Sequence, residues 1–190
     1  IIIFESVYEK FKKLFLDKSS KLKVWTSDDC DYGAIISKER MEQILRYVND
    51  AIKSGAKPIL GNPVSKRGIG YFIEPIVLEE VKTADPIWRE EVFGPVVVLA
   101  KARDLEDALR LANDCDFKLS GAIHTKSEER AQSFINRYIS GVLRVNGPTH
   151  GSEPHMPFGG VGMSGNGWRE PGSKALDFYS DWKQISIDSA

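Results

Sequence analysis

Val96-Val97-Val98-Leu99-Ala100 decides the fold, because a continuous apolar run rich in β-branched residues is typical of a strand buried on both faces of a sheet. A helical pattern follows at residues 104–113. The alternation continues with a strand at 121–124, a helix at 127–138 and a strand at 141–145. Strands and helices that alternate through short connections are typical of a parallel sheet with right-handed crossovers. The sequence therefore predicts the α/β class, with an open, mainly parallel sheet and flanking helices.

Upstream, the chain opens with Ile1-Ile2-Ile3-Phe4, which has the composition of another buried strand. This strand reads as if it began inside a larger sheet, and an ordinary first strand after a processed start is the alternative. Two helices are expected next, the first capped by Ser6 and the second running from a cap at Ser37 to a stop at Gly55. Short strands are expected at 57–60, 71–73 and 76–78, with a surface loop at 61–70.

Composition limits the possible partners. The 190 residues include 26 Lys and Arg and 27 Asp and Glu, a net charge of −1, so no overall field attracts nucleic acid or an anionic membrane. No apolar run reaches the roughly 20 residues that a membrane-spanning helix requires, and no signal-like segment is visible. The length suffices for one domain with one core. These features predict a cytoplasmic protein that binds small molecules and other subunits, with no nucleic-acid or membrane partner.

The cysteines and histidines offer little catalytic or metal-binding chemistry. Cys30 and Cys115 each lie between two aspartates, whose charges disfavour a thiolate, so neither is expected to be an activated nucleophile. His150 and His155 share one loop with too few further ligands for zinc, and no metal is expected. These two histidines are candidates for the mouth of a substrate pocket, whereas His124, at a strand end, is expected to be structural.

Two segments carry the strongest functional signal. The first is Glu91-Val92-Phe93-Gly94-Pro95. The second begins about 65 residues later and reads Pro157-Phe158-Gly159-Gly160-Val161-Gly162-Met163-Ser164-Gly165-Asn166-Gly167, followed by Arg169-Glu170-Pro171-Gly172. In this order and at this separation they resemble signature segments of the NAD(P)-dependent aldehyde dehydrogenases. The resemblance covers nearly all of the chain, and it corresponds to the C-terminal part of a full family member.

The first segment is implied to hold the cofactor. A carboxylate on a tight turn can accept hydrogen bonds from both hydroxyls of a ribose, each contributing about 1.5–3 kcal/mol. The resemblance implies this role for Glu91, toward the nicotinamide ribose of NAD or NADP, and places Phe93 near the nicotinamide ring. Gly94 permits close backbone approach, and Pro95 fixes the chain before the strand. Taken without the resemblance, Glu91 is one of several acids in an exposed turn and Phe93 is a core anchor.

The second segment is implied to meet the substrate, an aldehyde. Phe158 is expected on the pocket wall, and the loop just before it, with Asn146, Thr149 and Ser152, is expected to shape substrate choice. Glu170 is implied to help relay a proton from the general base, a role that requires partial burial. The alternative is that the glycines only mark a mobile surface loop.

Three departures from the family pattern limit the transfer of roles. Gly162 stands where many relatives carry Lys, and Phe117-Lys118-Leu119 replaces the usual Tyr-Gly-Leu. Trp168 is an extra residue before the Arg-Glu pair, and it shifts the position of Glu170 relative to the family pattern. None of the departures affects Glu91 or Phe93.

Family members oxidise an aldehyde to a carboxylic acid through a cysteine thiohemiacetal and a thioester. The nucleophile lies on a Gly-Gln-x-Cys segment, the general base on Glu-Leu-Gly-Gly, and the pyrophosphate-binding turn reads Gly-Ser-Thr. None of these occurs in the 190 residues. The chain is therefore expected to comprise a catalytic-domain portion at 1–172, cut just after the nucleophile segment, and an oligomerisation tail at 173–190 with a strand near 183–187. By itself it is expected to be inactive.

Two other functions stay open from the sequence. One is an assembly module that lends a sheet edge and the tail to a partner, most simply a second copy. The other is an unrelated small-molecule binding domain. The sequence does not determine the aldehyde or the choice between NAD and NADP, although the polar loop at 150–155 mildly favours a semialdehyde or hydroxyaldehyde.

Overall fold

The computed structural model describes residues 1–62 and 70–189. The chain divides into two compact units, Ile1–Cys115 (unit 1) and Asp116–Ala190 (unit 2). The expected functional boundary between residues 172 and 173 is of a different kind and stays a prediction. The surface loop expected at 61–70 lies largely outside the described residues.

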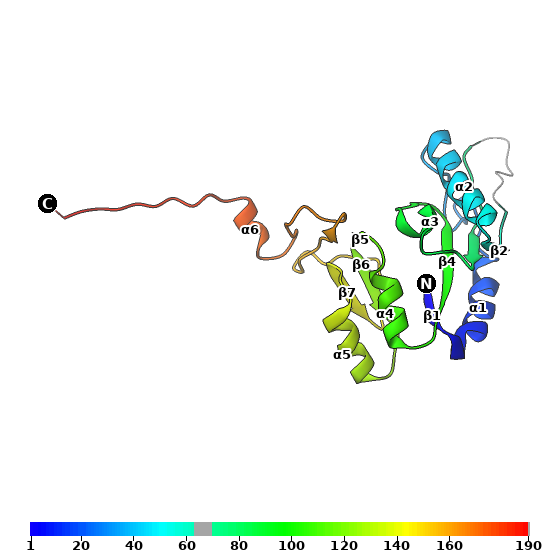
Figure 1. Ribbon diagram of the computed structural model, residues 1–190. Coiled ribbons are helices and arrows are strands. Elements are labelled where there is room, and N and C mark those ends of the chain that lie inside the picture. The colour runs from blue at the N-terminus through cyan, green and yellow to red at the C-terminus, as the bar shows by residue number, and fades with distance from the viewer. Residues whose placement is uncertain (63–69, 190) are drawn as a thin grey trace. The chain divides into compact units, whose positions relative to one another are not determined.

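Unit 1 is built on a four-stranded sheet in the order β1-β4-β3-β2 (Figure 1). β1 and β3 both run parallel to β4, with Ile2 opposite Ala100 and Ile76 opposite Val96, and β2 joins β3 in the antiparallel sense. The predicted mainly parallel sheet is confirmed, with one antiparallel edge strand. The strands are β1 Ile2–Phe4, β2 Lys57–Leu60, β3 Ile76–Glu79 and β4 Val96–Ala102.

Four helices accompany this sheet: α1 Glu5–Ser19, α2 Lys38–Lys53, α3 Pro86–Arg89 and α4 Leu105–Asn113. The predicted cap of α2 is confirmed, because the Ser37 hydroxyl accepts from the Arg40 amide at 3.2 Å. The predicted cap at Ser6 is wrong. The chain passes from β1 directly into α1 with Phe4 as the cap residue, so Ser6 already lies inside the helix.

The core of unit 1 covers both faces of β3. Ile76 and Leu78 pack with Ile44 and Val48 of α2, whereas Val77 belongs to the cluster that contains Ile3, Tyr8 and Leu99. Burial on both faces explains why this strand reads as a continuous apolar run rather than an alternating one.

The strand predicted at 71–73 is wrong, although its apolar character is not. Phe72 and Ile73 are buried, yet the segment forms no sheet ladder. Pro75 lies between it and β3, and proline cannot donate to a ladder. The apolar residues there serve the core without contributing a strand.

Unit 2 contains the second half of the predicted alternation. β6 and β7 pair in parallel, with Gly121 opposite Leu143, and α5 connects them after a cap in which the Ser127 hydroxyl accepts from the Arg130 amide at 3.2 Å. β5 and β8 form a separate antiparallel pair. The elements are β5 Phe117–Lys118, β6 Ser120–Ile123, α5 Glu128–Arg137, β7 Val142–Val145, β8 Val161–Gly162 and α6 Ala175–Phe178.

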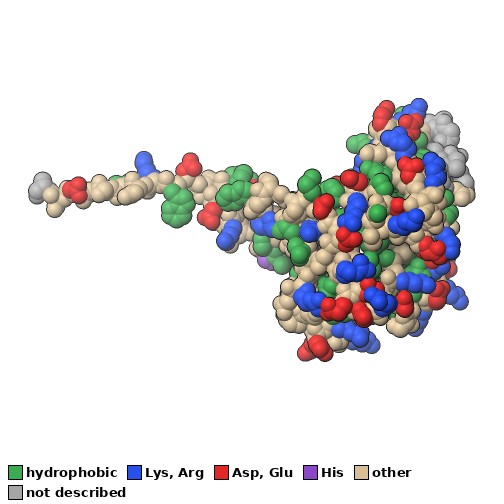
Figure 2. Space-filling view, in the orientation of Figure 1, with side chains coloured by type: hydrophobic (Ala, Val, Ile, Leu, Met, Phe, Trp, Pro, Cys, Tyr) green, Lys and Arg blue, Asp and Glu red, His purple; other side chains and the backbone are tan. Residues whose placement is uncertain are grey.

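The C-terminal residues 180–189 form neither helix nor strand in the single chain. A strand needs a hydrogen-bonded neighbour, and the described chain provides none there, so the oligomerisation strand near 183–187 stays a prediction. Among the described residues, no helix is both long and apolar enough to cross a membrane. On the face shown in Figure 2, basic and acidic side chains are interspersed.

The core packing predicts a large effect of truncating Leu78, which is fully buried. Leu78→Ala should lower the free energy of unfolding by about 2–5 kcal/mol, because it removes transfer free energy and leaves a cavity. Ile36→Ala is the matched control, since Ile36 is 91% exposed and should change stability by no more than about 0.5 kcal/mol. Urea unfolding followed by circular dichroism measures both. Equal effects of the two variants would contradict the described core.

A second prediction concerns Asp107, near the start of α4. Its carboxylate accepts from Arg103 Nε at 3.1 Å and Arg110 Nη2 at 2.8 Å, and these hydrogen bonds hold its pKa well below the usual 3.8. A lowered folded-state pKa contributes stability above the unfolded value, and that stability is lost as pH falls. Asp107→Asn should therefore destabilise the protein at pH 7, with the difference from wild type shrinking below about pH 4. Asp28→Asn, at an exposed position, is the control for loss of one carboxylate.

Candidate active site

The turn that carries Glu91 and Phe93 lies at the amino end of β4 and is fixed by an arginine from α2. Nη2 of Arg40 donates to the carbonyl oxygens of Glu91 at 3.1 Å and Val92 at 2.9 Å. Nη1 of the same guanidinium donates to Oε1 of Gln43 at 2.6 Å, which orients the group. Because a guanidinium presents its donors in a rigid fork, these contacts fix the backbone of the turn.

Close packing fixes the same turn from its other end. A Cβ added to Gly94 would lie 2.7 Å from Cδ1 of Ile44, which is fully buried, so a larger residue here would displace the turn from α2. The preceding Phe93 has φ of +49°, a left-handed conformation uncommon for an aromatic residue. Such strain persists only where the surroundings over-determine it, and it clusters at functional sites.

The side chains of Glu91 and Phe93 are exposed, whereas Val92 between them packs against the core. Phe93 is 77% exposed, which excludes the alternative that it is a core anchor. Glu91 is also exposed, and its carboxylate has no hydrogen bond or ion pair among residues 1–62 and 70–189. A carboxylate on a fixed backbone, without a partner in this part of the chain, can accept hydrogen bonds from two sugar hydroxyls, and an exposed ring beside it can cover a flat heterocycle.

Asn146, at the end of β7, begins the loop that was expected to shape substrate choice. Its Oδ1 accepts from the Thr125 amide at 2.8 Å, and its Nδ2 donates to the Thr125 carbonyl at 2.9 Å. The residue has φ of +57°, a conformation that asparagine tolerates better than most. Its amide therefore clamps two segments of unit 2 together. Thr149 and Ser152, further along the loop, are exposed.

Phe158 and Glu170 are brought together in unit 2. The Phe158 amide donates to the Glu170 carbonyl at 3.0 Å, and the Glu170 amide donates to the Phe158 carbonyl at 2.9 Å. Both side chains line a pocket of about 460 Å³. Glu170 is exposed in this unit, whereas a proton relay requires partial burial, so the relay role stays a prediction. Glu91 and Phe93, the residues expected to hold the cofactor, belong to unit 1.

Gly160 and Gly165 of the second segment, and Gly141 before β7, are required by close backbone approach. A Cβ on Gly160 would lie 2.3 Å from the Ser164 carbonyl oxygen, and one on Gly165 would lie 2.1 Å from the Gly160 carbonyl oxygen. One on Gly141, at the start of β7, would lie 1.7 Å from the Gly159 carbonyl oxygen. These positions have no room for a side chain. The alternative that the glycines only mark a mobile loop does not account for such packing.

Sequence reasoning missed part of the Phe158 pocket. Trp168 and Phe178 also line it, with their rings in edge-to-face contact at a centroid distance of 5.8 Å. The signal for Trp168 was its presence as an extra residue before the Arg-Glu pair. Phe178 carried no signal, because α6 is a single turn without a helical pattern of its own.

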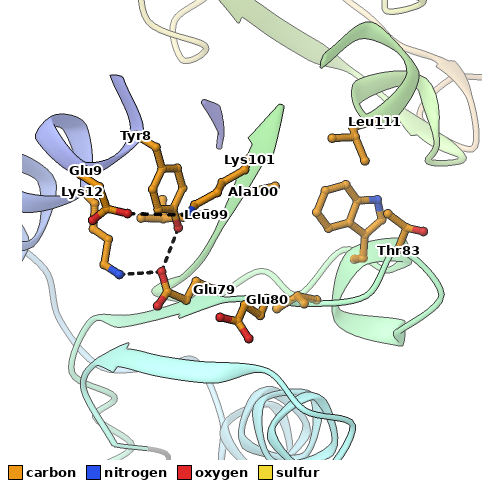
Figure 3. A pocket seen from close by; sticks show the side chains of 12 residues that line it. Tyr8, Glu9, Lys12, Glu79, Glu80, Thr83, Leu99, Ala100, Lys101 and Leu111 are labelled. Atoms are coloured by element: carbon orange, nitrogen blue, oxygen red, sulfur yellow. Dashed lines mark hydrogen bonds and ion pairs between the residues drawn. The ribbon is translucent and has the colours of Figure 1, made fainter. Parts of the chain in front are cut away.

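Unit 1 contains a second pocket, of about 450 Å³, near the carboxyl ends of β3 and β4 (Figure 3). Glu79 Oε2 accepts from the Tyr8 hydroxyl at 3.0 Å and from Lys12 Nζ at 2.6 Å. Burial and the neighbouring Glu79 raise the pKa of Tyr8 well above its usual range. Burial opposes ionisation of Glu79, yet these two hydrogen bonds hold its pKa below the ordinary value. This network joins α1 to β3. It lies at the carboxyl ends of the parallel strands, whereas the Glu91 turn lies at their amino ends.

The cysteines and metal-ligating residues add no further site. Cys115 Sγ donates to the Arg89 carbonyl oxygen at 3.7 Å, and both cysteines are free thiols. Within the part of the chain that the structure describes, no three His, Cys, Asp or Glu side chains form a group able to hold a metal ion.

Comparison with known proteins supplies a family. The profile of the aldehyde dehydrogenase family matches residues 1–185. The alpha-ketoglutaric semialdehyde dehydrogenase of Bacillus subtilis (strain 168) is 33% identical over 192 residues, covering 98% of this chain and 39% of that protein. The 2,5-dioxopentanoate dehydrogenase of Saccharolobus solfataricus is 35% identical, covering 97% and 39%. The chain thus spans about two-fifths of the length of the curated relatives that it matches.

Solved structures agree with the sequence relatives. Betaine aldehyde dehydrogenase from Staphylococcus aureus, in complex with NAD+, superposes with a TM-score of 0.87 at 32% identity, over 94% of this chain and 36% of that one. Aldehyde dehydrogenase 21 from Physcomitrella patens, in complex with the reaction product succinate, gives 0.83 at 29% identity, over 88% and 34%. With both signature segments present and the profile matching nearly the whole sequence, the chain belongs to the aldehyde dehydrogenase family.

Proposed function

We propose that this chain forms the part of an NAD(P)-dependent aldehyde dehydrogenase that holds the nicotinamide ribose and shapes the aldehyde pocket. The observation that carries the proposal is the turn at Glu91, where a carboxylate without a partner among the described residues stands on a backbone fixed by Arg40 and by close packing at Gly94. The Staphylococcus aureus neighbour was solved with NAD+, which supports the same cofactor class. The whole protein would oxidise an aldehyde to a carboxylic acid.

In this proposal Glu91 and Phe93 contact the cofactor, and Arg40 of α2 holds the turn that carries them. NAD or NADP, when bound, supplies the hydride acceptor. Glu91 accepts hydrogen bonds from the ribose hydroxyls, and the ring of Phe93 covers one face of the nicotinamide. Arg40 holds the turn in place, so that little backbone entropy is lost on binding.

The attacking thiolate and the water-activating carboxylate are supplied, in this proposal, by residues other than those of this chain. The 190 residues contain neither Gly-Gln-x-Cys nor Glu-Leu-Gly-Gly. Cys30 and Cys115 do not replace the nucleophile, since each is flanked by two carboxylates that oppose a thiolate. The chain on its own is therefore inactive.

On the substrate side, Phe158 forms the apolar wall, and Thr149 and Ser152 offer hydroxyls from the loop. These polar groups favour an aldehyde with a further polar substituent, such as a semialdehyde. The names of the Bacillus subtilis and Saccharolobus solfataricus relatives give substrates of this kind, which supports the choice. Glu170 is the proposed proton relay.

A second candidate function is assembly of a homo-oligomer through the tail, and the exposure of apolar side chains there favours it. Trp182 is 97% exposed, Ile185 72% and Ile187 89%. Side chains two residues apart lie on one face of an extended strand, so Ile185 and Ile187 would pack together if the tail joined a sheet edge of a second copy. This function and the enzymatic one are compatible.

The enzymatic proposal predicts NAD(P)-dependent oxidation of a semialdehyde by the complete protein that contains this chain, and no appreciable turnover by the 190 residues alone. Appearance of NAD(P)H measures both. Turnover by the isolated chain that is lost in Cys30→Ser or Cys115→Ser would show that the nucleophile lies within it.

Glu91→Gln in the complete protein should lower kcat/KM by roughly 10- to 150-fold, because one or two charged hydrogen bonds to the ribose are weakened. Glu90→Gln is the matched control, since Glu90 is the exposed neighbouring acid and should retain wild-type kinetics. Steady-state kinetics with the cofactor varied separates the two. An unchanged rate for Glu91→Gln would remove this residue from the site.

The assembly proposal predicts that the wild-type chain sediments as a dimer or larger species and that Ile185→Asp combined with Ile187→Asp is monomeric. Ser186→Asp is the control, because residue 186 would lie on the opposite face of an extended strand. Analytical ultracentrifugation measures the three. A wild-type chain that is monomeric at all concentrations would exclude the assembly role.

A further inference from the structure

Arg144 has an incomplete set of polar contacts. It lies in β7 opposite Ala122 of β6, and its side chain is half-buried. Nη2 donates to the carbonyl oxygen of Gly151 at 3.1 Å. Nε is buried and has no hydrogen-bond partner among the described residues. Because the guanidinium is always protonated, a charged donor is here both desolvated and unpaired.

Stability does not account for an arginine at this position. A buried donor without a partner destabilises a fold, and native proteins retain few of them. An apolar side chain of similar length would fill the same space without that penalty. Arginine provides what an apolar side chain does not, which is the hydrogen bond from Nη2 to Gly151, seven residues along the chain.

The loop contacted by Arg144 is held a second time at its start. Asn146 exchanges two hydrogen bonds with the backbone of Thr125. Between the two anchors lies Thr149, and Ser152 directly follows the second one. Gly151 has φ of +95°, so its conformation is one that glycine adopts far more easily than other residues.

We propose that Arg144 is a positioning residue for substrate specificity. Its hydrogen bond to Gly151 holds the loop so that the hydroxyls of Thr149 and Ser152 meet the aldehyde in a defined arrangement. The inference rests on the proposed function and adds a residue that acts through the loop without touching the substrate.

The first test replaces Arg144 in the complete protein. Arg144→Met should raise KM for the preferred semialdehyde roughly tenfold, while kcat stays within about twofold of wild type, since the loop acts in binding. Its Tm should be equal or higher, because the unpaired donor is gone. Arg144→Lys should bring KM part of the way back to the wild-type value, because an ammonium can donate to the same carbonyl oxygen. A lowered Tm, together with a fall in kcat as large as the rise in KM, would show a merely structural role and overturn the proposal.

The second test is a double-mutant cycle with Gly151→Ala, which strains the backbone that accepts the hydrogen bond. Each single variant should raise KM. The double variant should raise KM no further, since both substitutions disrupt the same hydrogen bond. Fully additive effects would overturn the proposal. Lys126→Met is the control for loss of a cation in the same unit, because Lys126 is exposed.

A third readout does not depend on activity. Backbone order parameters of Gly151 and Ser152, measured by NMR on the 190-residue chain, should fall in Arg144→Met and stay unchanged in Lys126→Met. Unchanged values in Arg144→Met would overturn the proposal. If the complete protein oxidises no aldehyde, the proposed function fails, and the order parameters still decide whether Arg144 holds the loop.

Discussion

Close packing of Gly94 against Ile44 is the constraint on which the proposed cofactor site depends. With no side chain at position 94, the turn before β4 reaches α2, and Ile44 at the contact point belongs to the core that also contains Leu78. The same helix supplies Arg40, whose guanidinium donates to two carbonyl oxygens of the turn. The core and the site therefore share one helix, and the outward direction of Glu91 follows from how that helix packs.

Two glutamates of unit 1 show how environment separates structure from function. Glu79, the last residue of β3, is paired with Lys12 and Tyr8, so its carboxylate joins α1 to the sheet. Glu91, before β4, is exposed and unpaired among the described residues. Because β3 and β4 are parallel, Glu79 at the carboxyl end of β3 and Glu91 before the amino end of β4 lie at opposite ends of the strands. Of the two, only the Glu91 carboxylate is available to accept hydrogen bonds from the hydroxyl groups of a ligand.

In unit 2, backbone contacts hold the segment that carries Phe158 and Glu170 in place. Gly141, Gly160 and Gly165 allow chain segments to approach at distances that a side chain would prevent. Paired backbone hydrogen bonds then join Phe158 to Glu170 across the glycine-rich segment. Phe158 and Glu170 are thus held by main-chain geometry. This explains how a segment with little regular secondary structure can still present side chains in fixed places.

Local sequence determined the alternation of β4, α4, β6, α5 and β7, the serine cap at residue 37, and the family to which the two motifs belong. These features depend on residues within a few positions of one another, so composition and spacing suffice to predict them. Only the tertiary structure decided that Arg40 holds the Glu91 turn and that the Asn146 side-chain amide is hydrogen-bonded to the backbone of Thr125. It also decided that the apolar residues at 71–73 belong to the core without forming a strand. Those outcomes depend on contacts between residues distant in the chain, which packing selects and local propensity does not encode.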